Sequence, residues 1–188
     1  AFAQCENLES IVLAETVTMI GGSCFEGDKK LQNVIIPSAC TTIGSSAFAY
    51  CSSLTSINIP DGITVIPYSC FSSCTEMSTI TGCKNVSSIG EYAFANSHLT
   101  SYPFGNSLKS IDRSAFQYSY LVSVTIPGSV RTIGEYAFYA CSYLEEVIFE
   151  EGNTFVGSHM FLRCKQLSKV SLASTITRID YGAFCEVG

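Results

Sequence analysis

Hydrophobic residues recur along this chain with a period of 22 or 23 residues. Phenylalanine shows the period most clearly, because nine of the twelve phenylalanines follow one another at that spacing. They are Phe2, Phe25, Phe48, Phe71, Phe94, Phe116, Phe138, Phe161 and Phe184. The hexapeptide IGEYAF, which ends on two of them, stands at residues 89–94 and again at 133–138. A short period that covers the whole chain predicts stacked repeats rather than ordinary globular domains.

Within each unit, apolar and polar residues alternate over a short stretch. In the third unit Leu54, Ile57 and Ile59 alternate with Ser56 and Asn58, as in a half-buried β-strand. A proline follows and removes a backbone donor, so the strand ends there. A second apolar pair about four residues later predicts another, shorter strand. Each unit is too small to bury its own apolar face, so stacked copies are expected to place Phe over Phe and Leu over Leu.

The segment after the second strand is expected to turn and then form about one helical turn. A glycine follows the second strand in five units, and glycine tolerates a left-handed backbone or starts a turn. These residues are Gly21, Gly44, Gly90, Gly134 and Gly157. Residues 45–51 can then form about one helical turn, with a serine available to cap its N-terminus. The predicted fold class is therefore α/β: a right-handed solenoid with a parallel sheet of longer strands, short second strands and single helical turns. We predict a single domain over residues 1–188, with eight complete units and a partial ninth.

The consensus Leu-x-x-Ile-x-Ile-Pro-x-x-Val-x-x-Ile-Gly-x-x-Ala-Phe-x-x-Cys resembles the leucine-rich repeat of the BspA-like family, over the whole chain. The resemblance implies that the longer strands line a concave face. It also implies a surface or secreted protein of a bacterium or parasitic protist, with adhesion to host proteins and cells as the usual role. Local departures from the repeat are expected at Pro67, in the one-residue-shorter fifth and sixth units, and at residues 153–156.

Composition limits the partners that the chain can bind. The net charge is −6 with only ten basic residues, and these are scattered, so a nucleic-acid partner is not expected. The apolar runs are far shorter than the roughly 20 residues that cross a bilayer. The first residues lie in mid-pattern, so we expect the chain to be an excerpt from a longer protein. Its open end coils are expected either to self-associate end to end or to be capped by neighbouring sequence in the intact protein.

Ten cysteines raise the question of disulfides, zinc or a nucleophile. Five of them, Cys5, Cys51, Cys74, Cys141 and Cys164, share one repeat position, and Cys24 and Cys70 stand where other units have Ala. Free cysteine packs as a small hydrophobe, so buried unpaired thiols are expected. Adjacent coils align Cys51 with Cys74 and Cys141 with Cys164, but a disulfide needs Cβ atoms closer than stacked coils bring them. The spacing is wrong for zinc, and no metal or cofactor is expected.

Catalytic chemistry is not indicated either. His98 and His159 fall in different units, and neither has a Cys, Ser or Asp in a recognisable nucleophile arrangement. Both are interpreted as exposed histidines in turns. We therefore expect no enzymatic activity and no small-molecule substrate.

The candidate binding surface is the row of outward strand positions. Its members are mostly short and polar: Asn33, Ile35, Ser56, Asn58, Thr79, Thr81, Glu145, Glu146, Ile148, Lys169 and Ser171. Such a face lacks the aromatic and Arg anchors of tight interfaces, which suggests weak or multivalent binding of a protein partner, or none. The acidic residues Glu145, Glu146, Glu150 and Glu151 are interpreted as a solvated face or as an attraction for calcium or a basic partner. Two functions remain open: an adhesion module that binds host protein, and a structural spacer that carries other domains.

Overall fold

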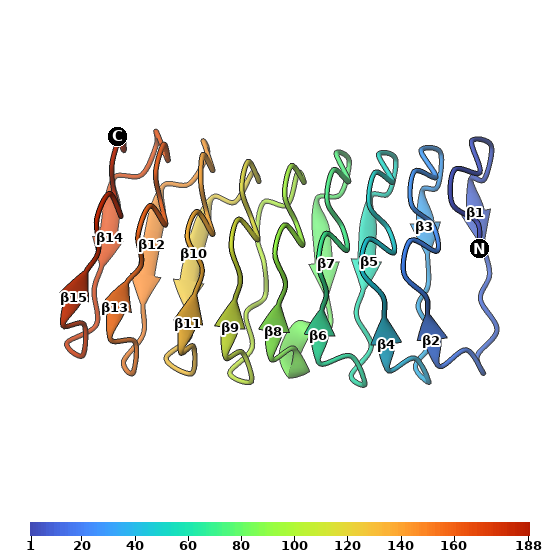
Figure 1. Ribbon diagram of the computed structural model, residues 1–188, viewed down its shortest axis with the longest axis horizontal. Coiled ribbons are helices and arrows are strands. Elements are labelled where there is room, and N and C mark those ends of the chain that lie inside the picture. The colour runs from blue at the N-terminus through green and yellow to red at the C-terminus, as the bar shows by residue number, and fades with distance from the viewer.

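The computed structural model describes all residues, 1–188, as a solenoid of stacked coils built from short parallel strands (Figure 1). Seven strands belong to one row, called here the first strand row: β1 (Ser10–Ile11), β3 (Asn33–Val34), β5 (Ser56–Asn58), β7 (Thr79–Thr81), β10 (Ser123–Ile126), β12 (Glu146–Phe149) and β14 (Lys169–Ser171). All of its pairings are parallel. The row consists of a four-stranded sheet, β1-β3-β5-β7, and a three-stranded sheet, β10-β12-β14.

The second strand row runs beside the first along the length of the molecule (Figure 1). It contains two-residue strands: β2 (Met19–Ile20), β4 (Thr42–Ile43), β6 (Val65–Ile66), β8 (Ser88–Ile89), β9 (Ser110–Ile111), β11 (Thr132–Ile133), β13 (Phe155–Val156) and β15 (Arg178–Ile179). These strands form parallel sheets of two, four and two members, with the order β11-β9-β8-β6 in the largest. The parallel strand pattern confirms the predicted solenoid, while the right-handed sense and the count of eight complete units stay predictions.

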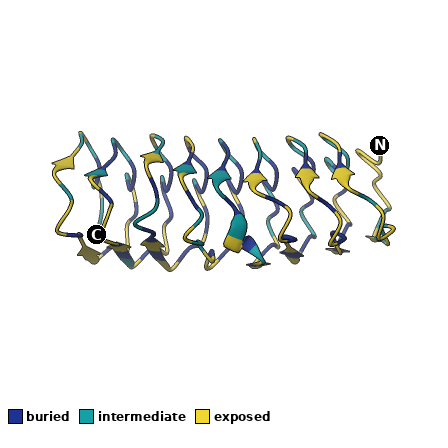
Figure 2. Ribbon diagram, turned by 90° about the horizontal axis from the view of Figure 1, so that it is seen from below, coloured by how far each residue is buried: buried dark blue, intermediate teal, exposed yellow.

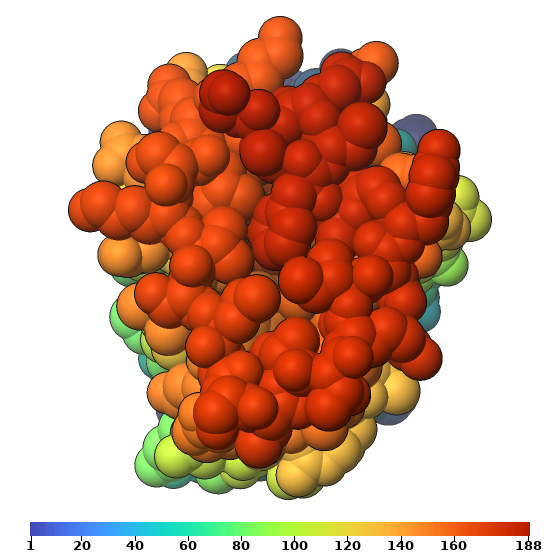
Figure 3. All heavy atoms as spheres, turned by 90° about the vertical axis from the view of Figure 1, so that its left-hand side faces the viewer, coloured from blue at the N-terminus to red at the C-terminus, as the bar shows by residue number.

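The core lies between the two strand rows and the turns that close each coil. A single cluster of 48 buried residues fills it. Figure 2 shows buried stretches in each of the middle coils, whereas the N-terminal coil is almost wholly exposed. The nine phenylalanine rings stack in sequence order, with neighbouring centroids 5.2–5.5 Å apart and planes within 13°. This stack of rings, called here the aromatic ladder, confirms the predicted placement of Phe over Phe. Seen end-on, the last coil is filled with atoms and shows no central opening (Figure 3).

The helical turns that the sequence predicted do not form, so the α/β class was wrong. The only helix is a three-residue 3-10 turn, η1 (Cys83–Asn85). In residues 45–51 the N–H groups of Ala47 and Ala49 bond carbonyls three residues back, as in β-turns. The N–H groups of Ser46, Phe48 and Tyr50 instead donate to the next coil, at 2.8–2.9 Å. Because every second N–H points along the solenoid, no α-helical bonding is left to this segment.

The left-handed residues of these turns are not the expected glycines. In the third unit Ser46 and Tyr50 have φ of 56° and 61°, whereas Gly44 is not among the residues with positive φ. A side chain at Gly44 would collide with the backbone of Gly22, and a Cβ at Gly90 would lie 2.8 Å from a backbone carbon of Pro67. These glycines therefore start the turn where two coils approach closely, and the strained backbone lies two residues later.

The first strand row is interrupted in the fifth unit. Residues 99–105 contain no strand, although the repeat predicts a longer strand in every unit. This unit is one residue short, and Pro103 has no N–H to donate. Tyr102 turns inward and packs edge-on at 5.3 Å from the rings of both Phe94 and Phe116. The aromatic ladder therefore continues where the sheet does not.

Candidate functional site

The predicted binding positions form the outer surface of the first strand row. All eleven are exposed except Glu146, which is half-buried, while the residues between them, such as Val34, Ile57 and Ile80, are buried. The alternation predicted from the sequence is therefore what the strands show. The structure brings these residues together in two groups, because the unpaired fifth unit separates β7 from β10.

The group on β3, β5 and β7 is a polar patch. Asn33, Ser56 and Thr79 are neighbours in register, and Asn58 lies opposite Thr81. The hydroxyl of Thr81 donates to the side-chain oxygen of Asn58 at 3.0 Å. This bond uses part of the hydrogen-bonding capacity of Thr81 and Asn58, whereas the side chains of Asn33, Ser56 and Thr79 make no such bond. The exposed Ile35 is the apolar exception.

The group on β12 and β14 has a different chemistry. Glu146 is the register partner of Lys169, and Ile148 is the partner of Ser171. None of these side chains takes part in the four ion pairs of the chain. Opposite charges and an exposed aliphatic side chain therefore lie side by side, and the charged groups are not used in ion pairs within the chain.

The acidic residues nearby divide into two pairs. Glu150 accepts a hydrogen bond from the N–H of Gly128 at 3.2 Å, and Glu151 accepts two from the N–H and hydroxyl of Ser174, at 2.8 and 3.0 Å. The bonds from Ser174 lower the pKa of Glu151. These two carboxylates join neighbouring coils, whereas the exposed Glu145 and the half-buried Glu146 make no side-chain hydrogen bond or ion pair. No group of three or more His, Cys, Asp or Glu side chains is placed to hold a metal ion.

The cysteines are packing and hydrogen-bonding groups. All ten are free, and seven are buried, which confirms the predicted thiols; Cys5 and Cys185 are exposed and Cys24 is half-buried. The thiols of Cys51, Cys74, Cys141 and Cys164 each donate to the carbonyl of the Phe one coil earlier, at 3.0–3.1 Å. Burial raises the pKa of Cys51 to about 12 and that of Cys83 to about 11. These two thiols stay largely protonated at neutral pH, which makes them poor nucleophiles.

The histidines are not the isolated exposed residues that the sequence suggested. His98 is half-buried and stacks on Tyr120 at 4.1 Å, and His159 stacks on Tyr136 at 5.1 Å. The Nδ1 atom of His159 lies 3.1 Å from a carboxylate oxygen of Glu135. Both rings therefore belong to aromatic clusters on the side of the turns.

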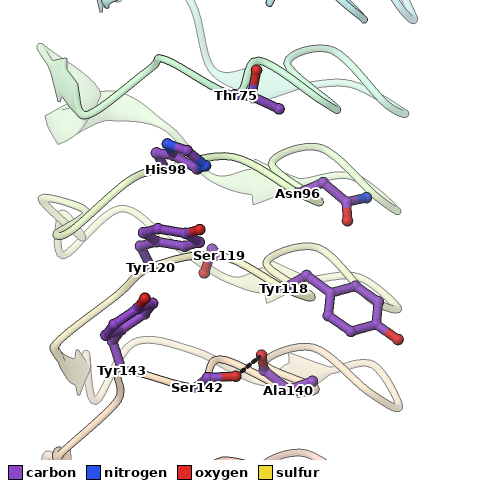
Figure 4. A pocket seen from close by; sticks show the side chains of 9 residues that line it. All are labelled: Thr75, Asn96, His98, Tyr118, Ser119, Tyr120, Ala140, Ser142 and Tyr143. Atoms are coloured by element: carbon purple, nitrogen blue, oxygen red, sulfur yellow. Dashed lines mark hydrogen bonds between the residues drawn. The ribbon is translucent and has the colours of Figure 1, made fainter.

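One of these clusters lines a groove that sequence reasoning missed. Its lining residues come from four consecutive coils: Thr75, Asn96, His98, Tyr118, Ser119, Tyr120, Ala140, Ser142 and Tyr143. In Figure 4 the rings of His98, Tyr120 and Tyr143 form one wall, and Asn96 and Tyr118 lie on the other. The sequence signal was a ring directly before the repeat leucine in three consecutive units, at His98, Tyr120 and Tyr143.

Comparisons with known proteins agree on the kind of repeat. The model of the BspA type leucine rich repeat region matches residues 1–122 and 84–187, with six copies. A leucine-rich repeat protein from Bacteroides ovatus has 22% identity and a TM-score of 0.70, over 99% of this chain and 60% of its own. The T. pallidum leucine-rich repeat protein has 24% identity and a TM-score of 0.61, over 91% of this chain and 72% of its own.

A third solved structure, the pneumococcal vaccine antigen PcpA, has 16% identity and a TM-score of 0.54, over 93% of this chain and 56% of its own. At these identities the solved structures bear on the fold alone. This chain spans three fifths of the Bacteroides ovatus protein. No curated protein matches the sequence. The fold contains no helix long and apolar enough to cross a bilayer.

Proposed function

Because this chain belongs to the BspA-type leucine-rich repeat family, we propose that it is a non-enzymatic, secreted or surface-displayed module that binds protein and mediates adhesion to host proteins or cells. The observation that carries the proposal is the outer surface of β12 and β14. There Glu145, Glu146, Ile148 and Lys169 present both charges and an aliphatic side chain from neighbouring coils. Interfaces use such mixed patches for register and specificity.

The same surface sets the expected strength of binding. It contains no Trp, Tyr or Arg, which are the residues that dominate high-affinity interfaces. A single module is therefore expected to bind weakly, and several copies on one surface bind through their combined avidity. This agrees with an adhesive role, in which many weak contacts act together.

The test is to replace Glu145, Glu146, Ile148 and Lys169 together by Ser. We expect adhesion of coated beads to immobilised matrix proteins and to epithelial cells to fall at least several-fold, with an unchanged circular dichroism spectrum and urea midpoint. A control variant carries Glu15→Ser, Val65→Ser and Lys109→Ser, exposed positions in the second strand row or in turns leading to it. The control is expected to adhere like the parent.

A second function, a structural spacer that carries other domains, is favoured by the patch on β3, β5 and β7. Its polar side chains partly satisfy one another, as the bond from Thr81 to Asn58 shows. If the fourfold Ser variant adheres as well as the parent while keeping its fold, the binding surface is refuted and the spacer is the better account.

A further inference from the structure

The groove between the aromatic walls is a built concavity. It is open to solvent and has a volume of about 460 Å³, within the range of roughly 300–1,000 Å³ typical of ligand sites. The first and fourth coils that line it are roughly 14 Å apart, at about 4.8 Å a coil. The groove therefore runs along the solenoid axis and suits an extended, chain-like ligand.

One wall is a continuous aromatic surface. His98 stacks on Tyr120 with ring centroids 4.1 Å apart, and Tyr120 lies 4.7 Å from Tyr143. Tyr120 and Tyr143 are 37% and 45% exposed although they are large aromatic side chains, and Tyr118 on the opposite wall is 46% exposed. Aromatic side chains combine an apolar body with a polar tip, which fits a ligand that has both kinds of surface.

Neutral donors and acceptors complete the lining. None of the nine residues is Asp, Glu, Lys or Arg. The hydroxyls of Ser142 and Thr75 bond backbone carbonyls within the chain, at 3.3 and 3.4 Å. The side-chain amide of Asn96 and the hydroxyls of Tyr120 and Tyr143 each donate and accept, and they are free for a ligand.

The same lining disfavours other ligand classes. An anionic ligand would need Lys or Arg, and the groove has neither. An extended peptide usually adds its backbone to a sheet edge, which requires a row of unpaired N–H groups. Here the N–H groups of Asn96 and Tyr118 already bond the next coil at 2.9 Å. A chain of neutral sugars fits this lining, because its C–H faces can pack on the aromatic wall and its hydroxyls can bond the polar groups.

We propose that the groove lined by His98, Tyr120, Tyr143, Asn96 and Tyr118 binds a neutral saccharide chain lying along the solenoid axis. The site is on the side of the turns and shares no residue with the surface of β12 and β14. A module with both sites would hold glycan and protein of one target at once.

Affinity gel electrophoresis tests the proposal with defined polymers in the gel: mannan, amylopectin, xyloglucan and galactan as neutral saccharides, heparin as an anionic one, and gelatin as a polypeptide. We expect at least one neutral saccharide to retard the parent chain and heparin not to. The double variant Tyr120→Ala with Tyr143→Ala should bind that saccharide at least tenfold more weakly. Tyr120→Phe with Tyr143→Phe keeps the rings and should lose less.

Two controls make the result specific. Tyr68→Ala with Tyr181→Ala removes exposed tyrosines outside the groove and should bind like the parent. The fourfold Ser variant of the first strand row should also keep saccharide binding, which separates this proposal from adhesion through β12 and β14. If the Ala double variant loses its fold, the Phe variant and Asn96→Ala decide the matter.

Several results overturn the proposal. No retardation by any of the four neutral polymers does so, as does retardation that survives in a folded Ala double variant. Retardation by heparin alone shows an electrostatic surface elsewhere. Retardation by gelatin that is lost in the double variant assigns the groove to a polypeptide.

Discussion

Removing one ring from the middle of the aromatic ladder should cost a large part of the stability. The ring of Phe48 is 0% exposed and lies between those of Phe25 and Phe71, at centroid distances of 5.2 and 5.4 Å. The planes are within 13° of parallel, so both contacts are stacked. The substitution Phe48→Ala deletes both contacts and opens a cavity between the coils. The coils cannot close this cavity by moving toward one another, because their turns are hydrogen-bonded to one another.

The magnitude follows from these two losses. Burying a Phe side chain is worth about 1.5–3 kcal/mol. Each aromatic contact adds about 0.5–1.5 kcal/mol beyond the buried area. The total agrees with the roughly 3–5 kcal/mol lost when buried Phe is cut to Ala. Phe2 provides the matched control, because it is 39% exposed and stacks on one ring only, at 5.5 Å. With about three fifths of that burial and one contact, Phe2→Ala should cost roughly 1.5–3 kcal/mol.

Urea unfolding measures the difference. Circular dichroism reports the strands, and tyrosine fluorescence is a second probe because the chain has no Trp. A cut in mid-ladder also weakens the coupling between the two halves of the array, so the unfolding curve of Phe48→Ala should broaden relative to that of the parent. A loss below about 1 kcal/mol, or one no larger than that of Phe2→Ala, would refute the role given to the ladder.

Three further predictions follow from buried polar groups and thiols. In native protein without reductant, Cys5 and Cys185 should react at once with a thiol reagent and close to ten thiols should react in urea; four or fewer in urea would reveal disulfides. Burial raises the pKa of the Asp28 carboxyl, against a smaller lowering by the N–H of Cys5. The stability that this group contributes is therefore full below the ordinary carboxyl pKa of about 4 and is lost as the pH rises through the higher folded value. Asp28→Asn should raise the urea midpoint at neutral pH and not in acid, and an equal gain at both would contradict this. Asn153 donates from Nδ2 to three backbone carbonyls at 2.8–3.3 Å. Asn153→Ala should therefore lower the free energy of unfolding in urea by about 1–3 kcal/mol, whereas the exposed Thr154→Ala should change it little. Equal losses in the two variants would be evidence against that bonding.

The repeat and its core were predictable because burial leaves a period in the sequence. Phe48 and Leu54 recur with each coil, and the alternation around Ile57 marks the face of a strand. The β-turns that stand in place of the expected helical turn were not predictable from local sequence, since Ser, Ala and Phe in residues 45–51 suit a helix equally well. What decides against the helix is the set of carbonyls in the next coil, which residues 22 positions away supply.

The same reasoning separates the two candidate sites. The outward positions on β12 and β14 follow from strand alternation, so Glu146 and Lys169 could be placed from the sequence. The groove was missed, although His98, Tyr120 and Tyr143 each stand directly before the repeat leucine, at Leu99, Leu121 and Leu144, so that register brings their rings together. The hollow between these rings and Tyr118 depends on side-chain packing, which the sequence does not show. The shared cysteine position was interpreted as a small hydrophobe, whereas its thiol also satisfies a carbonyl of the preceding coil.

The bonding between coils also bears on how such a chain changes over generations. Each coil takes its hydrogen-bond partners from the coil next to it, and the fifth unit shows that a coil can lose its place in the first strand row while the phenylalanine stack continues. A gene segment that encodes one whole unit can therefore be copied or lost without creating a new kind of contact at the junction. Length is then free to drift by recombination, and the reach of the molecule varies with copy number while its cross-section is inherited unchanged.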